Sequence, residues 1–374
     1  MPSDTKSAEN KPAPLMGHGA GRLPAVEVDC YNLGLKDNGG FLGDRARKQA
    51  FSDILDRLRK PLRKMDADPF GKEPTEEISK KDLDAAIGSD NPDAIGLMQG
   101  AIEEYAQELA FVAGKFLKSK NWRGTERIVI GGGMSESKYG QLAVARAGVL
   151  LKGDGAKIDL QPIRNHPDEA GLIGAVHLAP PWIFEAHDSI LAVDIGGTNI
   201  RAGVLDLNLK KARDLSKVSV WKRELWRHAD DKPSRTETIK NLCDLLTKLI
   251  RQAEKEGFKL APFIGIGCPG QIESDGSISD GAQNLPGNWE SERFHLPQAL
   301  VETIPTIGDH ETVVLMHNDA VVQGLSEVPF MQDVEHWGVL TIGTGLGNAR
   351  FTNRASNGKE KEKEKEKDKE KEKK

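Results

Sequence analysis

The stretch VDIGGTN at residues 193–199 says more about the fold than any other part of this chain. Apolar residues lead into an acid, two glycines and a threonine, and apolar residues then alternate over 200–205 as in a second strand. We therefore expect a hairpin whose turn is Gly196-Gly197. Such a turn can bring backbone N–H groups up to a phosphate, and Asp194 could hold the magnesium ion that accompanies a nucleotide. An ordinary structural hairpin has the same pattern and is the alternative.

Length and charge limit the class of protein. A chain of 374 residues is long enough for two domains. The formal net charge is −5, without a basic stripe interleaved with aromatic residues, which argues against nucleic acid or an anionic membrane as the main partner. We find neither an apolar run of about 18 residues nor the apolar core of a secretory signal, so we expect a cytoplasmic protein.

The cysteines and the two ends of the chain suggest little chemistry. Cys30, Cys243 and Cys268 lie far apart without the spacing of a zinc site, and we expect small buried residues rather than disulfides. Lysine alternates with acidic residues from Lys359 onward, which offers nothing apolar to bury. We expect disordered tails over 1–20 and 358–374.

A strand ending in glycines also precedes the 193–199 stretch. Apolar residues at helical spacing predict a helix over 102–116, and RIVI at 127–130 predicts a strand that ends in Gly131, Gly132 and Gly133. Ser135 is the expected N-cap of a helix through Leu142, Ala145 and Leu150. The triple glycine would then allow a ligand to approach the backbone closely, or it forms an ordinary tight connection.

Two further segments suggest a binding site. A helix over 235–253 precedes a strand at 263–268 in which glycine alternates with isoleucine, as where other backbone crosses a buried strand closely. The loop NLPGNW at 284–289 could place an amide and an indole against a sugar. A surface turn anchored by Trp289 is the alternative.

The last two predicted strands end in an acid and in glycines. The apolar run 313–316 leads to His317-Asn318-Asp319, where Asp319 is well placed to abstract a proton, although it could equally cap the helix that starts at Ala320. The run 339–342 leads into GTGLG at 343–347. That glycine turn lacks the spacing of the dinucleotide fingerprint and of the P-loop, so it is weak evidence alone.

Together these motifs resemble the ROK family of sugar kinases and sugar-responsive regulators, which belongs to the actin-like ATPase superfamily. The motifs that carry the resemblance are DxGGTxxRxG at 194–203, GxGxPG at 265–270, NLPG at 284–287, ND at 318–319, GTGxG at 343–347, IGGG at 130–133 and AGLIGA at 170–175. The resemblance covers roughly residues 95–354. It implies an α/β fold of two ribonuclease-H-like lobes, with ATP and Mg²⁺ in the cleft between them and a sugar beneath the γ-phosphate.

The order of the motifs departs from the family. Members run from the DxGGT loop to the IGGG and AGLIGA elements, whereas here these two come first. We therefore predict a circular permutation that joins the helix at 168–178 to the strand before Asp194 through residues 179–189. The expected domains are a larger lobe over 21–187, a smaller lobe with the first phosphate loop and the catalytic Asp over 188–333, and the first strands of the larger lobe over 334–357.

The resemblance also implies a role for each motif. Phosphate and Mg²⁺ would be bound by Asp194, Gly196, Gly197 and Thr198, and the second phosphate loop would be Gly343, Thr344, Gly345 and Gly347. Adenosine would lie against Gly131, Gly132 and Gly133, and we expect that a bulky residue at Gly132 weakens ATP binding without unfolding the chain. Asn284 and Asn318 would bind sugar hydroxyls, and Asp319 would be the general base. The sequence does not decide between ATP and polyphosphate as the phosphoryl donor. It also does not decide whether the protein is a homo-oligomer.

One family motif is missing. A loose alignment places Arg22 and Ala25 where sugar-kinase members have the Glu and His of a Glu-x-Gly-His stretch, and no zinc motif follows. A non-catalytic sugar- or nucleotide-binding regulator is therefore the alternative to an ATP-dependent sugar kinase. Regulators of the family carry a DNA-binding helix-turn-helix, for which the segment before residue 50 has neither the length nor a basic helix. This favours the kinase.

Overall fold

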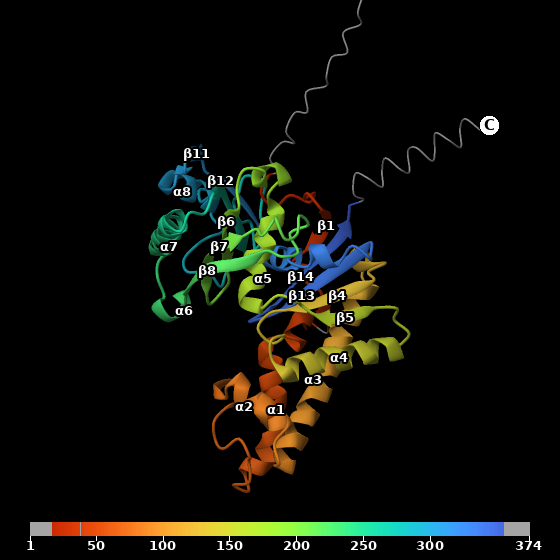
Figure 1. The fold of residues 1–374 in the computed structure, drawn as a ribbon. Coiled ribbons are helices and arrows are strands. Elements are labelled where there is room, and N and C mark those ends of the chain that lie inside the picture. The colour runs from red at the N-terminus through yellow and green to blue at the C-terminus, as the bar shows by residue number, and fades with distance from the viewer. Residues whose placement is uncertain (1–16, 38, 355–374) are drawn as a thin grey trace, which may run out of the picture.

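The computed structural model describes residues 17–37 and 39–354, and its core is a pair of five-stranded sheets (Figure 1). The sheet of the first lobe has the order β1 (Val26–Tyr31), β14 (Leu346–Asn353), β13 (His336–Ile342), β4 (Arg127–Gly131), β5 (Asp159–Pro162). The sheet of the second lobe has the order β12 (Val313–Asn318), β9 (Leu260–Cys268), β6 (Ser189–Ile195), β7 (Ile200–Asp206), β8 (Ser219–Trp226). Two small ladders lie outside them, formed by β2 (Lys36–Asp37) with β3 (Gly40–Phe41) and by β10 (Thr306–Ile307) with β11 (His310–Glu311).

The two sheets share one topology. In the second lobe β6, β7 and β8 form an antiparallel meander, and β9 and β12 continue the sheet in parallel on the other side of β6. In the first lobe β13, β14 and β1 form the same meander, and β4 and β5 continue it in parallel beyond β13. Each sheet is that of a ribonuclease-H-like lobe, as the sequence predicts.

The first lobe reaches this topology with a different chain order. Among the described residues its third strand, β1, is the first strand, whereas its first and second strands, β13 and β14, are the last. This order fits the predicted circular permutation, which itself stays a prediction. Of the tails expected over 1–20 and 358–374, residues 1–16 and the whole second tail lie outside the described residues. Residues 17–20, counted with the first tail, lie against β12, where the N–H of Gly19 donates to the carbonyl of Met316.

The helices other than α5 and α9 divide between the two lobes. The first lobe carries α1 (Lys48–Arg63), α2 (Lys80–Ile87), α3 (Pro92–Lys118) and α4 (Lys138–Gly153), of which α1 to α3 extend away from the sheets (Figure 1). The second lobe carries α6 (His228–Asp231), α7 (Arg235–Lys255) and α8 (Leu296–Thr303). Short 3₁₀ turns connect them at η1 (Leu42–Arg45), η2 (Thr75–Glu77), η3 (Lys120–Trp122), η4 (Ala175–Leu178), η5 (Pro181–Phe184) and η6 (Val328–Phe330).

Two helix predictions have different outcomes. In α3 the predicted apolar positions from Ile102 to Phe116 are buried, which confirms the periodicity. In α4 the predicted N-cap is wrong: Ser137 accepts from the N–H of Gly140, while the Ser135 hydroxyl donates to the carbonyl of Gly132 inside the preceding turn. The buried face of α4 is displaced by one residue from the face that the sequence predicts, and Leu142 is exposed.

Two helices cross between the lobes. α5 (Pro167–Gly174) follows β5 of the first lobe but packs on β6 and β7 of the second, whereas α9 (Asp319–Leu325) follows β12 and packs on β13 and β14. Their backbones touch, because a Cβ at Gly174 would lie 1.7 Å from the carbonyl oxygen of Val322. The last residue of α5 therefore lies directly against the middle of α9.

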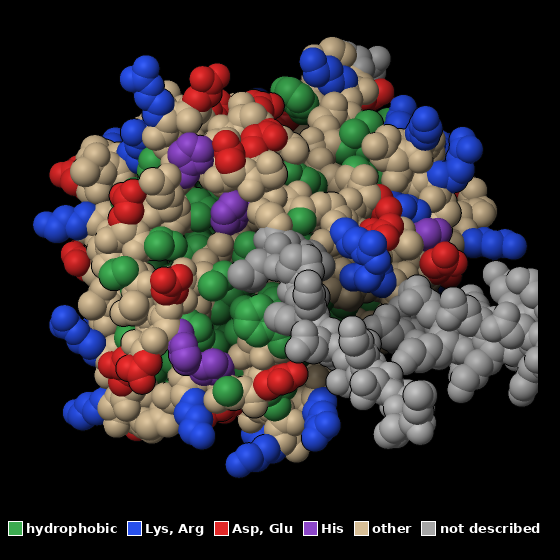
Figure 2. All heavy atoms as spheres, turned by 90° about the horizontal axis from the view of Figure 1, so that it is seen from above, with side chains coloured by type: hydrophobic (Ala, Val, Ile, Leu, Met, Phe, Trp, Pro, Cys, Tyr) green, Lys and Arg blue, Asp and Glu red, His purple; other side chains and the backbone are tan. Residues whose placement is uncertain are grey.

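Within residues 17–37 and 39–354, no helix has both the length and the apolarity of a membrane crossing. On the face seen from above, apolar side chains gather in the centre and charges of both signs are interspersed around them (Figure 2).

Candidate functional site

A cavity of about 370 Å³ opens between the lobes and collects most of the residues that the sequence singles out. The predicted residues that line it are Gly132, Gly133, Asp194, Gly196, Gly197, Thr198, Asn284, Asp319, Gly343, Thr344, Gly345 and Gly347. They come from five segments of the chain and belong to both lobes. Gly131 and Asn318 do not line it.

Both glycine turns present backbone donors to this cavity. In the first turn the N–H groups of Gly197 and Thr198 have no hydrogen-bond partner among the described residues, and in the second the same holds for Thr344 and Gly345. A Cβ at Gly345 would meet nothing within 4 Å, so a ligand can approach that backbone. Unpaired backbone N–H groups in a turn are suited to phosphate oxygens.

The first turn is held by a residue that sequence analysis did not mark. His228 follows β8, is 2% exposed, and its Nε2 lies 2.8 Å from the carbonyl oxygen of Gly196. The N–H of Ala229 donates to the carbonyl of Thr198 at 3.3 Å. Since both contacts use carbonyl groups, the N–H groups of the turn stay free to face the cavity.

Asp194 is the last residue but one of β6, lines the cavity and is 8% exposed. Its carboxylate accepts from Arg201 at 3.2 Å, and Arg201 also donates to Asp168 at 2.7 Å. Burial raises the pKa of Asp194, and Arg201 opposes this without cancelling it. A Cβ at Gly171 would lie 2.6 Å from the Asp194 carboxyl carbon, so the carboxylate rests directly on the backbone of α5.

The donor set fits a magnesium ion only in part. In the described ranges no group of three or more His, Cys, Asp or Glu side chains gathers as a metal site. Mg²⁺ commonly takes one or two protein carboxylates and completes its octahedron with water and substrate phosphate oxygens. Asp194, which lines the cavity beside the first turn, is a carboxylate of that kind.

Asp319 is the first residue of α9, and its carboxyl group lines the cavity. The alternative that it serves as the helix cap is wrong: Asn318 is the N-cap, and its side-chain oxygen accepts from the N–H groups of Ala320 and Val321. Burial, followed by the charge of Asp194, raises the pKa of Asp319 to about 6. A carboxyl group in this range is suited to general base catalysis near neutral pH.

Two residues of the expected sugar site have structural roles instead. Asn318 is fully buried, and its amide nitrogen donates to the carbonyl of Gly270 at 3.0 Å, so no part of the side chain remains for a sugar. Trp289 is 1% exposed, and its indole N–H donates to the carbonyl of Pro286. We therefore keep only Asn284, which lines the cavity, as a candidate sugar ligand from these two motifs.

The three glycines at the end of β4 differ in their surroundings. Gly131 is the last residue of the strand and does not line the cavity, and a Cβ there would lie 2.4 Å from the side-chain oxygen of Gln323. Gly132 has φ +87°, and a Cβ there would lie 2.1 Å from the carbonyl oxygen of Ile342. Substitution of Gly132 would therefore disturb the first sheet, contrary to our expectation that it leaves the fold intact. Gly133 is exposed and lines the cavity, and a Cβ there would meet only the Lys80 ammonium at 3.5 Å.

Gly133→Val is therefore the substitution that tests the adenosine side of the cavity. We expect a thermal unfolding midpoint close to that of the wild type and a nucleotide Kd raised by about 10-fold, since the added side chain would cost about 1–3 kcal/mol of steric conflict with the ligand. A titration with a non-hydrolysable ATP analogue measures this. Gly153→Val is the matched control, because a Cβ there meets nothing within 4 Å and Gly153 lies outside the cavity. Unchanged affinity in a folded Gly133→Val protein would contradict the assignment.

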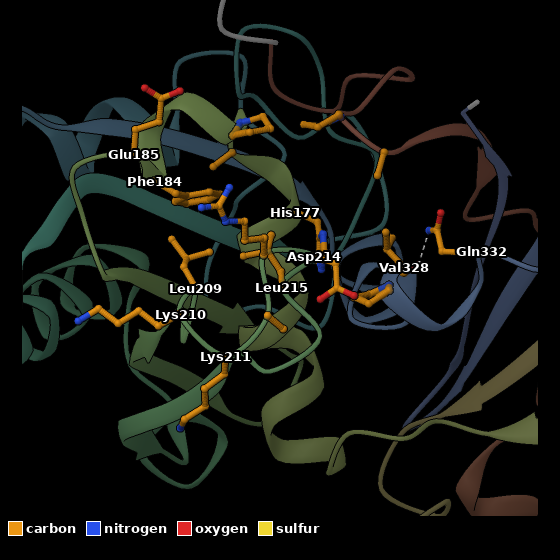
Figure 3. A pocket seen from close by; sticks show the side chains of 17 residues that line it. His177, Phe184, Glu185, Leu209, Lys210, Lys211, Asp214, Leu215, Val328 and Gln332 are labelled. Carbon is orange, nitrogen blue, oxygen red and sulfur yellow. Dashed lines mark hydrogen bonds between the residues drawn. The ribbon is translucent and has the colours of Figure 1, made fainter. Parts of the chain in front are cut away.

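A larger cavity of about 1130 Å³ lies elsewhere and contains none of the predicted site residues. It is lined by η5, by residues 209–215 and by the segment around Val328 (Figure 3). Ala25 also lines it, and Arg22 lines neither cavity. The loose alignment with the family's Glu-x-Gly-His stretch therefore does not place a side chain in the cleft.

Residues 190–359 match the model of the ROK family, and this part of the chain contains Asp194, Asp319 and both glycine turns. Two ribonuclease-H-like lobes around a cleft form the fold of the actin-like ATPase superfamily, which is therefore the fold class of this protein.

Solved structures with similarity to the chain include two ROK enzymes. A ROK hexokinase from Thermus thermophilus is 23% identical with a TM-score of 0.31, over 43% of this chain and 45% of that one. A ROK family glucokinase from Streptomyces griseus, in complex with glucose and AMPPNP, is 20% identical with a TM-score of 0.33, over 45% of this chain and 47% of that one. The chain thus spans about half the length of the structures that it matches. No curated protein matches the sequence.

Proposed function

We propose that this protein is an ATP-dependent kinase that phosphorylates a hydroxyl group of a sugar or amino sugar. The observation that carries the proposal is Asp319, a carboxyl group with a pKa of about 6 in a cavity that both glycine turns border. A carboxyl group with a pKa in this range is suited to take a proton from a hydroxyl group near neutral pH. The match of residues 190–359 to the model of the ROK family supports a sugar as acceptor.

Each of the side chains and turns in the cavity has a separate role in the proposed reaction. Asp319 takes the proton from the attacking hydroxyl, and Asn284 contacts another hydroxyl of the sugar. The N–H groups of Gly197, Thr198, Thr344 and Gly345 hold phosphate oxygens, and Gly133 leaves room for adenosine. Asp194 would hold Mg²⁺, which when bound neutralises charge on the transferred phosphoryl group. The protein's contribution is then mainly the positioning of donor and acceptor.

We also propose that the chain is a circularly permuted member of its fold. The support is topological: the first-lobe sheet follows the order of the second-lobe sheet only when it is counted from β13 through β14 to β1. The ends of β14 and β1 are neighbours, since Asn353 pairs with Val26 and the N–H of Arg354 donates to the carbonyl of Ala25. A chain connection between the two strands would therefore be short.

ADP release measured on a panel of hexoses and hexosamines tests the proposed function. We expect turnover with at least one sugar that depends on both ATP and Mg²⁺. Polyphosphate in place of ATP separates the two possible donors. Sugar and nucleotide binding without turnover would contradict the kinase and favour the regulator of the same family.

The pKa of Asp319 predicts the pH dependence of the reaction. The base must be ionised, so we expect kcat/KM to be constant above pH 7 and to fall about 10-fold per unit as the pH drops below about 6. A cation bound at Asp194 would lower the pKa of Asp319 and move the fall to lower pH, never to higher. The pH profile of kcat/KM at saturating Mg²⁺ and ATP measures it. An acid limb with a midpoint well above pH 7 would exclude Asp319 as the group that titrates.

A further inference from the structure

Asn32 lines the cavity, although no motif in the sequence marks it. It follows β1, so it belongs to the first lobe, and its side chain is exposed. Neither the oxygen nor the nitrogen of its amide has a hydrogen-bond partner among the described residues. The amide therefore presents a free donor and a free acceptor to the space between the lobes.

The backbone of Asn32 is fixed in an uncommon conformation. Its φ is +51°, in the left-handed region, which asparagine tolerates better than most residues. The N–H of Asn32 donates to the carbonyl of Asn348 at 3.1 Å. The buried side chain of Asn348 then accepts from the N–H of Leu33 at 3.0 Å and donates to its carbonyl at 3.3 Å. Asn348 thereby clamps the turn that directs the Asn32 side chain.

The same turn docks on the second lobe beside the proposed sugar site. The hydroxyl of Tyr31 accepts from the N–H of Ile272 at 3.3 Å and lies 3.4 Å from its carbonyl oxygen. A Cβ at Gly281 would lie 3.5 Å from the amide nitrogen of Asn32. Gly281 precedes Asn284 by three residues, so Asn32 lies against the loop that carries the proposed sugar ligand Asn284.

The charges of the cavity limit what these amides can bind. Arg201 is the one cationic side chain in its lining as the structure describes it, and its guanidinium is paired with Asp194 and Asp168. No cation is left for a carboxylate or phosphate on the acceptor, while Asp194 and Asp319 would repel one. Neutral amides are suited to hydroxyl and acylamino groups, to which they can donate and from which they can accept.

We propose that Asn32 determines acceptor specificity by binding an uncharged polar group of the sugar, a hydroxyl or an acylamino group, and that Asn348 is its positioning residue. This inference rests on the proposed kinase function. It gives the first lobe a contact with the acceptor at a position that neither Arg22 nor Ala25 occupies.

Steady-state kinetics with the preferred sugar tests the proposal on three variants. Asn32→Gly removes the amide and suits the left-handed backbone, and Asn32→Asp keeps the shape but loses the donor. We expect both to raise the sugar KM by about 10-fold, the effect of one lost hydrogen bond, with kcat within about 3-fold. Asn348→Ala should raise the KM in the same direction, because it releases the turn while Asn32 is intact. The Kd of a non-hydrolysable ATP analogue should stay unchanged in the Asn32 variants.

Asn208→Gly is the matched control, since Asn208 also has a positive φ, +50°, but lies outside the cavity. It should leave the sugar KM at the wild-type value. Wild-type KM in Asn32→Gly would overturn the proposal, and so would a change confined to kcat or to the nucleotide Kd.

A failure of the kinase function has a different signature. If the wild type turns over no sugar, calorimetric titration with the same sugar panel replaces the kinetics. Binding to the wild type that weakens about 10-fold in Asn32→Gly would then support Asn32 as a specificity residue of a binding protein. Equal binding by both proteins, or no binding by either, would overturn the inference.

Discussion

Replacement of Asp319 by Asn should lower kcat by about 100- to 10,000-fold, the range that removal of a general base commonly gives. Asn keeps the size of the side chain but cannot take the proton of the attacking hydroxyl. Nucleotide should still bind, because the N–H groups of the two glycine turns are untouched. Single-turnover measurements at saturating sugar and ATP, with a parallel titration of a non-hydrolysable ATP analogue, separate the two steps.

The same substitution should not harm the fold. Burial and the charge of Asp194 disfavour the ionised form of Asp319, which is why its pKa is raised, and a neutral amide removes that conflict. We therefore expect a thermal unfolding midpoint equal to or above that of the wild type. Asp90→Asn, at an exposed position outside the cavity, is the control and should leave kcat unchanged. Wild-type kcat in Asp319→Asn would remove Asp319 from the mechanism.

Local patterns predict the parts of the fold that are local. The hairpin around Gly196-Gly197 follows from period-two alternation and a glycine turn within one stretch, and β6 and β7 form as expected. The ion pair of Asp194 with Arg201 could have been predicted from the same hairpin, because these residues are direct cross-strand partners in it. The overlooked signal was the register, which places a cation opposite the acid.

The roles of other residues depend on distant segments and have no local signal. The side-chain amide of Asn318 donates to the carbonyl of Gly270, which lies in another loop. The indole of Trp289 packs in the core of the second lobe, although the sequence of its loop is polar. Asn32 enters the cavity because Asn348, near the other end of the chain, clamps the residue that follows it. Such contacts are set by the order of strands in the sheet, which one-dimensional spacing does not contain.

Replacement of Arg201 by Met should have the largest effect on stability. The Arg201 side chain is 16% exposed and pairs with Asp194 and Asp168. Its loss leaves two carboxylates without their main partner beneath the first glycine turn, and removal of one member of a buried pair costs about 3–5 kcal/mol. Because the side chains here are only partly buried, we expect about 3 kcal/mol less free energy of unfolding, measured by urea denaturation at pH 7 without Mg²⁺. Arg57→Met, which breaks an exposed pair with Glu104, should cost at most about 1 kcal/mol.

The deficit of Arg201→Met should also depend on pH in a defined direction. Arg201 lowers the pKa of Asp168 and opposes the rise in the pKa of Asp194, so its removal raises both values in the folded state. A folded protein whose carboxyl groups bind protons more tightly than those of the unfolded chain loses stability as the pH rises. The loss begins near the carboxyl pKa of the unfolded chain, about 4, and is complete above the raised pKa of the folded state. The difference from the wild type should therefore be small at acid pH and largest near neutrality. The double variant Arg201→Met/Asp194→Asn should recover part of the loss at pH 7, because one of the two unpaired charges is gone. A deficit that is independent of pH, or no recovery in the double variant, would show that Arg201 contributes through packing rather than through its charge.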